Sequence, residues 1–230
     1  HIVTVDVPLG PDKRLRAAFE WLTVEGDLMH DATEGQAGFL WNMVSPRSDV
    51  SGRIEVLDQT GKSKQLIHYR GTGYHDHVSG TDALNEILNC RQWGRAHFND
   101  CTAVYCVVDT ESVGHGAARL IVTRDGTISM RSADVGATRF QRDLHGIRYP
   151  KRIVLDGEDD VCLRAKPVET IESTFYNVRS LSEMTLTLND GKPRKTIGIS
   201  EIVSPKNMKY KLFRWLSDLQ IDRKEGGSHF

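Results

Sequence analysis

Short runs of alternating apolar and polar residues dominate the chain. Between residues 182 and 188, Met184, Leu186 and Leu188 alternate with polar side chains, which predicts a strand with one face on a core and one in water. Comparable runs, rich in β-branched and aromatic residues, lie at 15–26, 38–44, 51–58, 64–71, 101–109, 118–132, 151–157, 161–169, 182–191 and 195–203. Strands that are separated by turns and not by helices predict an all-β antiparallel architecture with barrel-like sheets.

Two Asp-Gly pairs indicate tight turns between neighbouring strands. Asp125-Gly126 and Asp190-Gly191 each lie between alternating runs, which is a strong signal for a β-hairpin. A polar, glycine-bearing stretch at 109–117 is the best candidate for a boundary between two domains.

Only two segments favour a helix. Residues 80–90 predict two or three helical turns, with Thr81 or Asp82 as the N-cap. Residues 204–220 predict a terminal helix that packs across a barrel mouth or a sheet face, since they carry an apolar stripe at helical spacing: Leu212, Trp215, Leu216 and Leu219. The few basic residues of this helix make only a weak case for membrane association.

The composition of the chain argues against some classes of function. The 230 residues include 30 basic and 31 acidic side chains, a net charge of −1, so nothing favours a nucleic acid partner. No apolar run reaches the ~18 residues of a membrane helix, and no signal peptide is visible. The chain begins at His1, so the location stays unknown, with the cytoplasm favoured. The cysteines lack paired spacing and predict buried free thiols: Cys90, Cys101, Cys106 and Cys162.

The stretch RGTGYHDHVSG, residues 70–80, gathers groups that carry protons or bind metals. If it ends a strand, Tyr74 and Asp76 point to one face, while His75 and His77 point to the other. The two pairs therefore suggest two separate hypotheses for the function of this stretch.

The histidine pair suggests a metal site. An H-x-H pair on one strand is how cupin barrels hold a metal, and His97 would be the candidate for a third ligand. The expected glutamate is missing, because Glu86 is the first one after His77. We therefore expect no metal; the alternative is that one histidine orders a loop and the other is partly exposed.

The Tyr74–Asp76 pair suggests proton transfer. In an apolar cavity, desolvation raises the pKa of a carboxylic acid, so the acid stays protonated near neutral pH and can donate a proton. Tyr74 would then hydrogen-bond the acid or the substrate. The alternative is that Asp76 caps the following turn or pairs with an arginine.

Two further stretches carry candidate pocket residues. Alternation in 92–100 divides the side chains between faces: Trp93, Arg95, His97 and Asn99 on one, and Gly94, Ala96 and Phe98 on the other. An arginine beside Asp76 would hold the carboxylate ionised, which makes Arg95 decisive for the acid hypothesis. In 39–56, Trp41, Asn42 and Arg47 are candidates to approach a cavity, with core packing as the alternative for Trp41.

Several of these motifs resemble one family. SPRSDVSGRIEV, GTGYHDH and WGRAHF, with FYNVRSLSEM and KYKLFRWLSDLQ near the end, resemble the carotenoid 1,2-hydratase (hydroxyneurosporene synthase) superfamily. That superfamily also includes AttH-like bacterial proteins, kievitone hydratase and fungal Diels–Alderases. The resemblance spans most of residues 38–220.

The resemblance implies tandem lipocalin-like β-barrels around an apolar pocket. We accordingly expect an N-terminal barrel at 1–110, a C-terminal barrel at 111–208, and a terminal helix with a polar tail at 209–230. It also implies that the first barrel is incomplete here, so that a missing N-terminal segment or a second chain supplies its opening strands.

The resemblance also implies a chemistry. Tyr74 and Asp76 match the pair implicated in protonating an isolated C=C bond in carotenoid hydratases. The chain departs from the family at Val78-Ser79-Gly80, and upstream, where Asn42 and Val44 precede Pro46 in place of a histidine and a tryptophan. These departures put carotenoid hydration itself in question while keeping the acid.

We therefore expect a cofactor-independent enzyme that acts on a hydrophobic polyene or terpenoid. Asp76 would protonate an alkene with help from Tyr74, giving hydration, isomerisation or cyclisation, including a pericyclase-type reaction that pre-folds its substrate. The substrate would be bound by a larger set: Trp93, Arg95, His97, Trp41, Asn42, His75 and His77. The alternative function is a non-catalytic lipid or small-molecule binder of lipocalin type.

Overall fold

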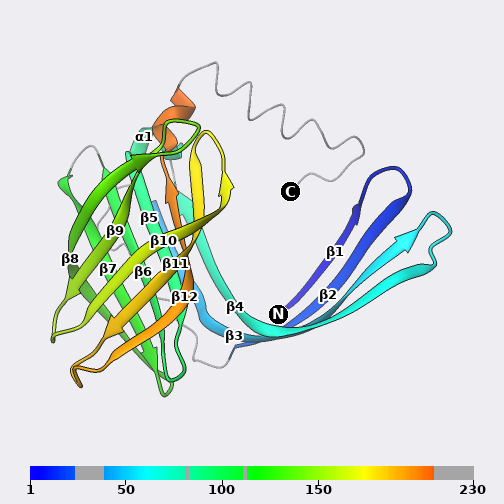
Figure 1. Cartoon of the computed structure of the whole chain (residues 1–230), viewed down its shortest axis with the longest axis horizontal. Helices are drawn as coiled ribbons and strands as arrows, with labels where there is room; N and C mark the ends of the chain where they lie inside the picture. Colours follow the sequence, from blue (N-terminus) through cyan, green and yellow to red (C-terminus); the bar gives the residue numbers. More distant parts are fainter. Residues whose placement is uncertain (24–38, 81–82, 111–112, 210–230) are drawn as a thin grey trace. The chain divides into compact units, whose positions relative to one another are not determined.

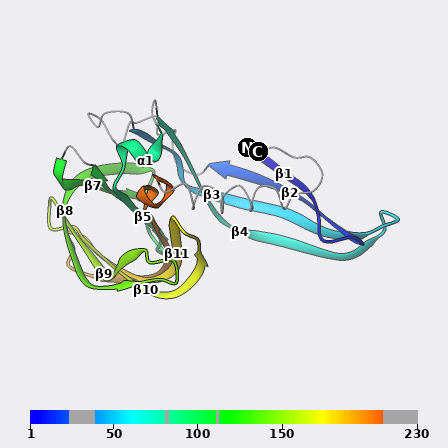
Figure 2. The same cartoon turned by 90° about the horizontal axis from the view of Figure 1, so that it is seen from above.

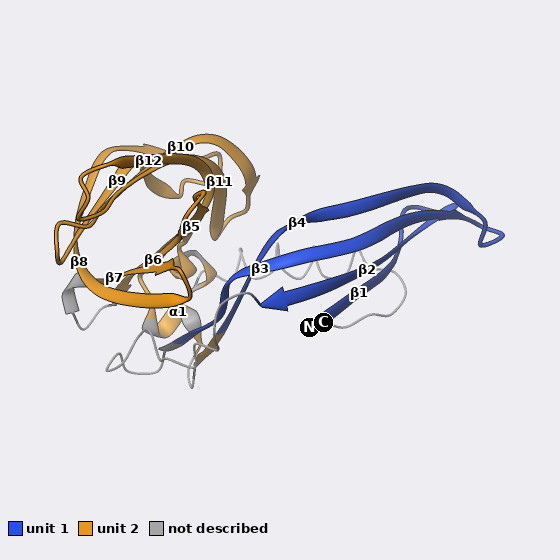
Figure 3. Cartoon of the chain, turned by 90° about the horizontal axis from the view of Figure 1, so that it is seen from below, with its two compact units in different colours: residues 1–31, 41–77 blue, residues 32–40, 78–230 orange. Residues whose placement is uncertain are grey.

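A computed structural model describes residues 1–23, 39–80, 83–110 and 113–209 (Figure 1). Strands make up nearly all of it, as the alternation predicts. The chain divides into two compact units, residues 1–31 with 41–77, and residues 32–40 with 78–230 (Figure 3).

The first unit is an antiparallel sheet of four strands in the order β1-β2-β3-β4. The strands are β1 (Ile2–Pro8), β2 (Lys13–Thr23), β3 (Phe39–Asp58) and β4 (Ser63–Gly80). Each strand pairs with the strand next to it in sequence. Because β3 and β4 are neighbours, residues 41 and 76, far apart in sequence, belong to adjoining strands.

Close packing on one face of this sheet explains a glycine in β4. The indole of Trp21 lies so near Gly73 that an added Cβ would come within 2.4 Å of the ring and within 2.6 Å of Val50. Only glycine fits below the ring. Since side chains alternate along a strand, Tyr74 points to the opposite face of the sheet.

The second unit is a closed antiparallel barrel of eight strands, seen from above in Figure 2. Its order around the ring is β10-β11-β12-β5-β6-β7-β8-β9. The bounds are β5 (Cys90–His97), β6 (Thr102–Thr110), β7 (Val113–Arg124), β8 (Thr127–Arg142), β9 (Arg148–Gly157), β10 (Cys162–Ser173), β11 (Asn177–Thr187) and β12 (Pro193–Val203).

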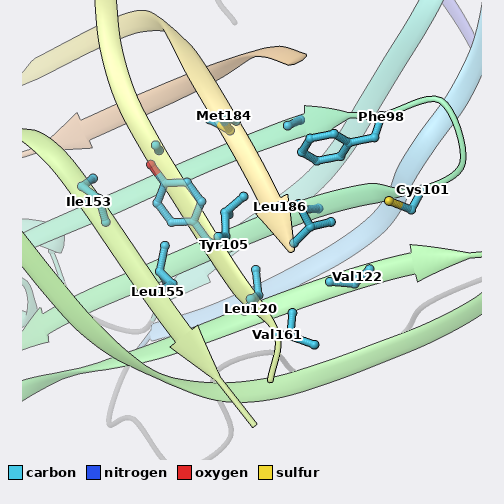
Figure 4. Close-up of a cluster of buried hydrophobic side chains, with 14 of the residues drawn as sticks. Phe98, Cys101, Tyr105, Leu120, Val122, Ile153, Leu155, Val161, Met184 and Leu186 are labelled. Carbon is cyan, nitrogen blue, oxygen red and sulfur yellow. The ribbon is translucent and has the colours of Figure 1, made fainter. Parts of the chain in front are cut away.

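Apolar side chains from alternate strand positions fill the barrel (Figure 4). The largest among the almost completely buried members are Tyr105, Leu120, Ile153, Leu155, Leu163, Met184 and Leu186. An eight-stranded barrel has an interior just wide enough for side chains to fill, and here one tyrosine lies among the aliphatic groups.

Both predicted hairpins are present. Asp125 and Gly126 have φ angles of 52° and 73° between β7 and β8, and Arg124 pairs with Thr127 across the two-residue turn. Gly191, with φ of 68°, lies between β11 and β12. These left-handed conformations are what the Asp-Gly pairs predict.

One expectation about architecture needs correction, and two others are met only in part. The described part of the first unit is an open four-stranded sheet, as an incomplete first barrel allows. The boundary expected at residue 110 falls inside the closed barrel, between β6 and β7, because a polar hairpin connection has the composition of a linker. The predicted terminal helix is described only as a short 3-10 helix, η1 (Pro205–Lys209).

Two parts of the helix predictions lie outside the described residues. Residues 210–220 of the terminal helix are among them, and so are the caps expected at Thr81 and Asp82. The helix expected at 80–90 is shorter than the predicted two or three turns, since α1 (Leu84–Ile87) has four residues. No helix within the described residues is long and apolar enough to cross a membrane.

Candidate functional site

The carboxyl group of Asp76 accepts two side-chain hydrogen bonds at one oxygen. Trp41 Nε1 donates to Asp76 Oδ2 at 2.9 Å, and the Tyr74 hydroxyl donates to the same oxygen at 3.1 Å. Tyr74 and Asp76 are two residues apart on β4, so alternation puts them on one face. Trp41 reaches the carboxyl from the neighbouring strand β3.

The three residues differ in how firmly packing holds them. Trp41 is completely buried, with 0% of its surface exposed, whereas Tyr74 and Asp76 are half-buried. A buried indole has little freedom to rotate, so it sets the position of Oδ2. The half-buried carboxyl and phenol are the parts of the group nearest to solvent.

The chemistry of the two donors gives the carboxyl a defined orientation. An indole N–H only donates, and a phenol O–H donates while its oxygen can still accept from another group. Because Oδ2 receives two hydrogen atoms, a proton carried by Asp76 belongs on Oδ1. This arrangement can deliver a proton from Oδ1 and stabilise negative charge on Oδ2.

The histidines of the cluster do not come together as metal ligands. The His75 ring makes an edge-to-face contact with the His1 ring at 5.2 Å, and His77 is exposed. Within the described residues, no three His, Cys, Asp or Glu side chains are grouped closely enough to hold a metal ion.

Asn42 follows Trp41 on β3 and therefore points to the other face of the sheet. It is half-buried, and its Oδ1 atom is buried without a hydrogen-bond partner in the described part of the chain. The structure thus separates Asn42 from the Asp76 carboxyl, although the two were grouped in one predicted pocket.

The polar face expected at 92–100 belongs to the barrel. Ala96 and Phe98 are part of its interior core, so Trp93, Arg95 and His97 lie on its outer face. His97 Nδ1 is 3.0 Å from the Thr102 hydroxyl. The alternation is therefore as predicted within β5, but these side chains do not line the closed barrel.

Sequence reasoning missed the role of Trp41. A tryptophan in a short apolar run usually packs in a core, and Trp41 is indeed buried. Its indole N–H also needs a partner when buried, and that requirement is the signal which could have linked it to a nearby carboxylate.

A comparison with models of protein families identifies the family of this chain. The model of the carotenoid hydratase CrtC family matches residues 22–229, nearly the whole chain. The chain belongs to this family. The match includes the Trp41–Tyr74–Asp76 group and the complete barrel.

A curated relative of this CrtC-family chain is a hydroxyneurosporene dehydrogenase of Chlorobaculum tepidum. The two are 23% identical over 220 residues, which is 92% of this chain and 57% of the relative. The chain therefore spans little more than half the length of that protein.

Solved structures share the fold at low identity. A putative AttH of Nitrosomonas europaea matches with a TM-score of 0.59 and 15% identity, over 88% of this chain and 65% of its own. CghA in complex with Sch210972 matches with a TM-score of 0.58 and 10% identity, over 84% of this chain and 64% of its own. At these identities the likeness concerns the fold.

Proposed function

We propose that this chain carries the proton donor of an enzyme that protonates a C=C bond in an apolar polyene or terpenoid. The observation that carries the proposal is the double hydrogen bond to Oδ2 of Asp76 from Trp41 and Tyr74. Membership of the carotenoid hydratase family supports a polyene as the substrate class.

Asp76 begins the reaction as the neutral acid with its proton on Oδ1. The π electrons of the alkene take this proton, so that a C–H bond forms, the O–H bond breaks, and a carbocation and an aspartate remain. Trp41 and Tyr74 already point their hydrogens at Oδ2, where negative charge now develops. Donors that bind the charged state more tightly than the neutral one lower the barrier.

Water completes a hydration. A water molecule attacks the cation, and the Asp76 carboxylate removes its extra proton, which restores the acid and leaves an alcohol. If the carboxylate instead removes a proton from a neighbouring carbon, the product is an isomer. If a second C=C bond of the substrate attacks the cation, a ring and a new cation form, and the Asp76 carboxylate removes a proton from that cation to give a cyclic isomer.

The decisive experiment compares Asp76→Asn with Asp49→Asn. Asp49 is exposed on β3 and serves as the matched control. Each protein is incubated with an acyclic carotenoid in D2O, and both binding and product are measured. General acid catalysis contributes about 10²- to 10⁴-fold, so Asp76→Asn should lose turnover by that factor with binding unchanged within a few-fold.

The product distinguishes the remaining routes. Hydration adds one molecule of D2O, one deuterium of which stays on carbon. Isomerisation or cyclisation leaves the mass of the substrate unchanged apart from exchange, and dehydrogenation removes two hydrogens. Turnover that survives in Asp76→Asn would refute the assignment. Tight binding without any turnover in the unaltered protein would instead identify a binding protein.

Arg95 is the residue whose charge bears on this proposal. The pH dependence of turnover is measured in the unaltered protein and in Arg95→Met. A general acid acts in its protonated form, so a gain of turnover at high pH in Arg95→Met would show that the charge of Arg95 favours the ionised carboxylate, and it would favour a base in place of an acid.

A further inference from the structure

The part of the β8–β9 hairpin nearest its turn, residues 135–155, carries more positive than negative charge, and the acids Asp134 and Asp156 lie just beyond it. Residues 135–155 contain five basic side chains, all exposed: Arg139, Arg142, Arg148, Lys151 and Arg152. None of the five forms an ion pair within the described part of the chain, whereas arginines elsewhere, such as Arg179 and Arg194, bind carboxylates.

The single acid of this stretch is used internally. Asp143 exposes only 5% of its side chain. Its Oδ1 accepts hydrogen bonds from the backbone N–H groups of His145 and Ile147, and its Oδ2 accepts one from the Ser173 hydroxyl at 2.7 Å. Asp143 therefore ties the turn of the hairpin to the end of β10 and does not neutralise the arginines.

One face of the hairpin is anchored on the barrel. Ile147 and Tyr149 form a small buried cluster with Val178 at the start of β11 and Ile202 near the end of β12. The hairpin, whose strands belong to the barrel wall, is consequently held in a defined orientation at one end of the barrel, and its other face is exposed.

The solvent face brings like charges together. Arg142 lies directly opposite Arg148 in the β8–β9 register, and Phe140 lies opposite Pro150. The Arg148 guanidinium stacks on the exposed Phe140 ring at 4.0 Å. Like charges directly opposite in a sheet destabilise it, so an anion bound between the two arginines would relieve a strain that the hairpin otherwise bears.

The turn of the hairpin presents an apolar side chain to water. Leu144 is 99% exposed, more than any other large apolar residue described. A leucine at the tip of a basic hairpin matches an anionic lipid surface, which offers phosphates to the arginines and an acyl boundary to the leucine. A nucleic acid offers the phosphates alone.

We propose that the β8–β9 hairpin docks this protein on an anionic lipid bilayer. Arg142 and Arg148 contact the headgroup phosphates, and Leu144 enters the acyl boundary. The docking surface shares no residue with the Asp76 group, and the proposal stands whether or not the proposed chemistry is correct. Its test measures binding to vesicles and does not involve turnover.

The test is co-sedimentation of the purified chain with vesicles of phosphatidylcholine that contain phosphatidylserine. Each basic residue near such a surface strengthens binding about fivefold, so Arg142→Gln with Arg148→Gln should weaken it about 25-fold. The control is Lys192→Gln with Lys195→Gln, which removes the same charge from exposed sites on the same barrel and should change binding by less than the hairpin pair does.

The apolar contact is tested separately. Leu144→Ser should weaken vesicle binding about tenfold, since burial of a leucine contributes on this scale, whereas Ile197→Ser, at another exposed apolar site of the barrel, should not. Vesicles of phosphatidylcholine alone should bind weakly. The proposal fails if anionic vesicles do not bind, if the two pairs of basic substitutions act alike, or if Leu144→Ser has no effect and DNA binds as well as the vesicles.

Discussion

The indole N–H of Trp41 donates a 2.9 Å hydrogen bond to Oδ2 of Asp76 across the β3–β4 pair. A completely buried donor thus holds a half-buried carboxyl, while the Tyr74 hydroxyl shares the same oxygen. The two donors are not equivalent, because indole can only donate and is fixed by packing. Substitutions at Trp41 and Tyr74 should therefore have different consequences.

Tyr74→Phe removes one donor and keeps the ring. A hydrogen bond to a charged group is worth about 1.5–3 kcal/mol, so the loss should reduce kcat about 10- to 100-fold. Since Tyr74 is half-buried, the free energy of unfolding should change little. Tyr69→Phe is the control, because Tyr69 is exposed on the same strand and should leave kcat unaltered. Equal effects of the two variants would contradict the assignment.

Trp41→Phe should reduce both turnover and stability. The smaller ring leaves a void at a position with no solvent exposure, and large-to-small changes of this kind reduce the free energy of unfolding by about 1–3 kcal/mol. Urea unfolding measures this loss, and kinetics at a temperature where the variant is folded measure the loss of the donor. Unchanged kcat in folded Trp41→Phe would show that Tyr74 alone positions the carboxyl.

Gly94→Ala should destabilise the barrel. An added Cβ would lie 2.4 Å from Cε1 of the Tyr105 ring, and both residues are buried. Overpacking of a core costs about 1–3 kcal/mol, which urea unfolding would detect. Gly136→Ala is the matched control, since its nearest neighbour, Val154 Cβ, lies at 3.8 Å. A double variant with Tyr105→Leu should lose less than the sum of the single losses.

The alternation of residues along one strand is sufficient to predict that Tyr74 and Asp76 share a face. Both residues belong to one strand, and parity along a strand needs no knowledge of the rest of the fold. The contact with Trp41 depends on how β3 pairs with β4, and alternation does not define the register between strands. The same limit applies to the outer face of β5, whose polarity is plain in the sequence but whose place in the barrel is not.

The hairpin between β7 and β8 follows from the sequence better than the boundary between the units does. Asp125-Gly126 identifies a hairpin because its left-handed conformation has a chemical requirement. The connection between β6 and β7 has no such requirement and reads as a linker. The function of the basic residues at 139–152 cannot be predicted from the sequence alone, because it depends on which charges lack a partner after folding.

The cysteines should be unreactive in the native protein, although only Cys101 and Cys106 are buried as expected, and Cys90 and Cys162 are half-buried. Burial and the charge of Asp109 raise the pKa of Cys90 to about 12, and burial raises the pKa of Cys101 to about 11. The thiolate is the nucleophile, so labelling with a thiol reagent at pH 8 should be slow and should become fast for all four thiols on unfolding. Rapid native labelling of Cys90 would contradict this prediction.

The raised pKa values of the thiols also predict how the free energy of unfolding changes at alkaline pH. An unfolded thiol ionises near its ordinary value of 9.0, whereas the folded thiol stays protonated to higher pH. The folded state therefore binds more protons above that value, and stability should fall as the pH rises from about 9 towards 12. Replacing Cys90 with alanine should reduce this slope, measured by urea unfolding.

Acid should weaken the barrel at the end where Arg194 lies. The Arg194 guanidinium bonds Asp190 at 2.7 Å and Asp100 at 3.0 Å, and thereby connects the β11–β12 turn with the β5–β6 connection. The hydrogen bond from Arg194 holds the pKa of Asp190 well below its ordinary value. Burial opposes a similar effect at Asp100, but Arg194 still lowers the pKa of that carboxyl.

The lowered pKa values of Asp190 and Asp100 define the pH range in which their contribution to stability is lost. The stabilisation is present above the unfolded value of 3.8 and is lost as the pH falls through the lower folded values. We expect the urea midpoint to fall steeply below about pH 4, and Arg194→Met to lower it at neutral pH while flattening the acid slope. Lys195→Met, an exposed change on the same strand, should preserve the slope. An acid slope that is identical in Arg194→Met would show that other carboxylates govern acid unfolding.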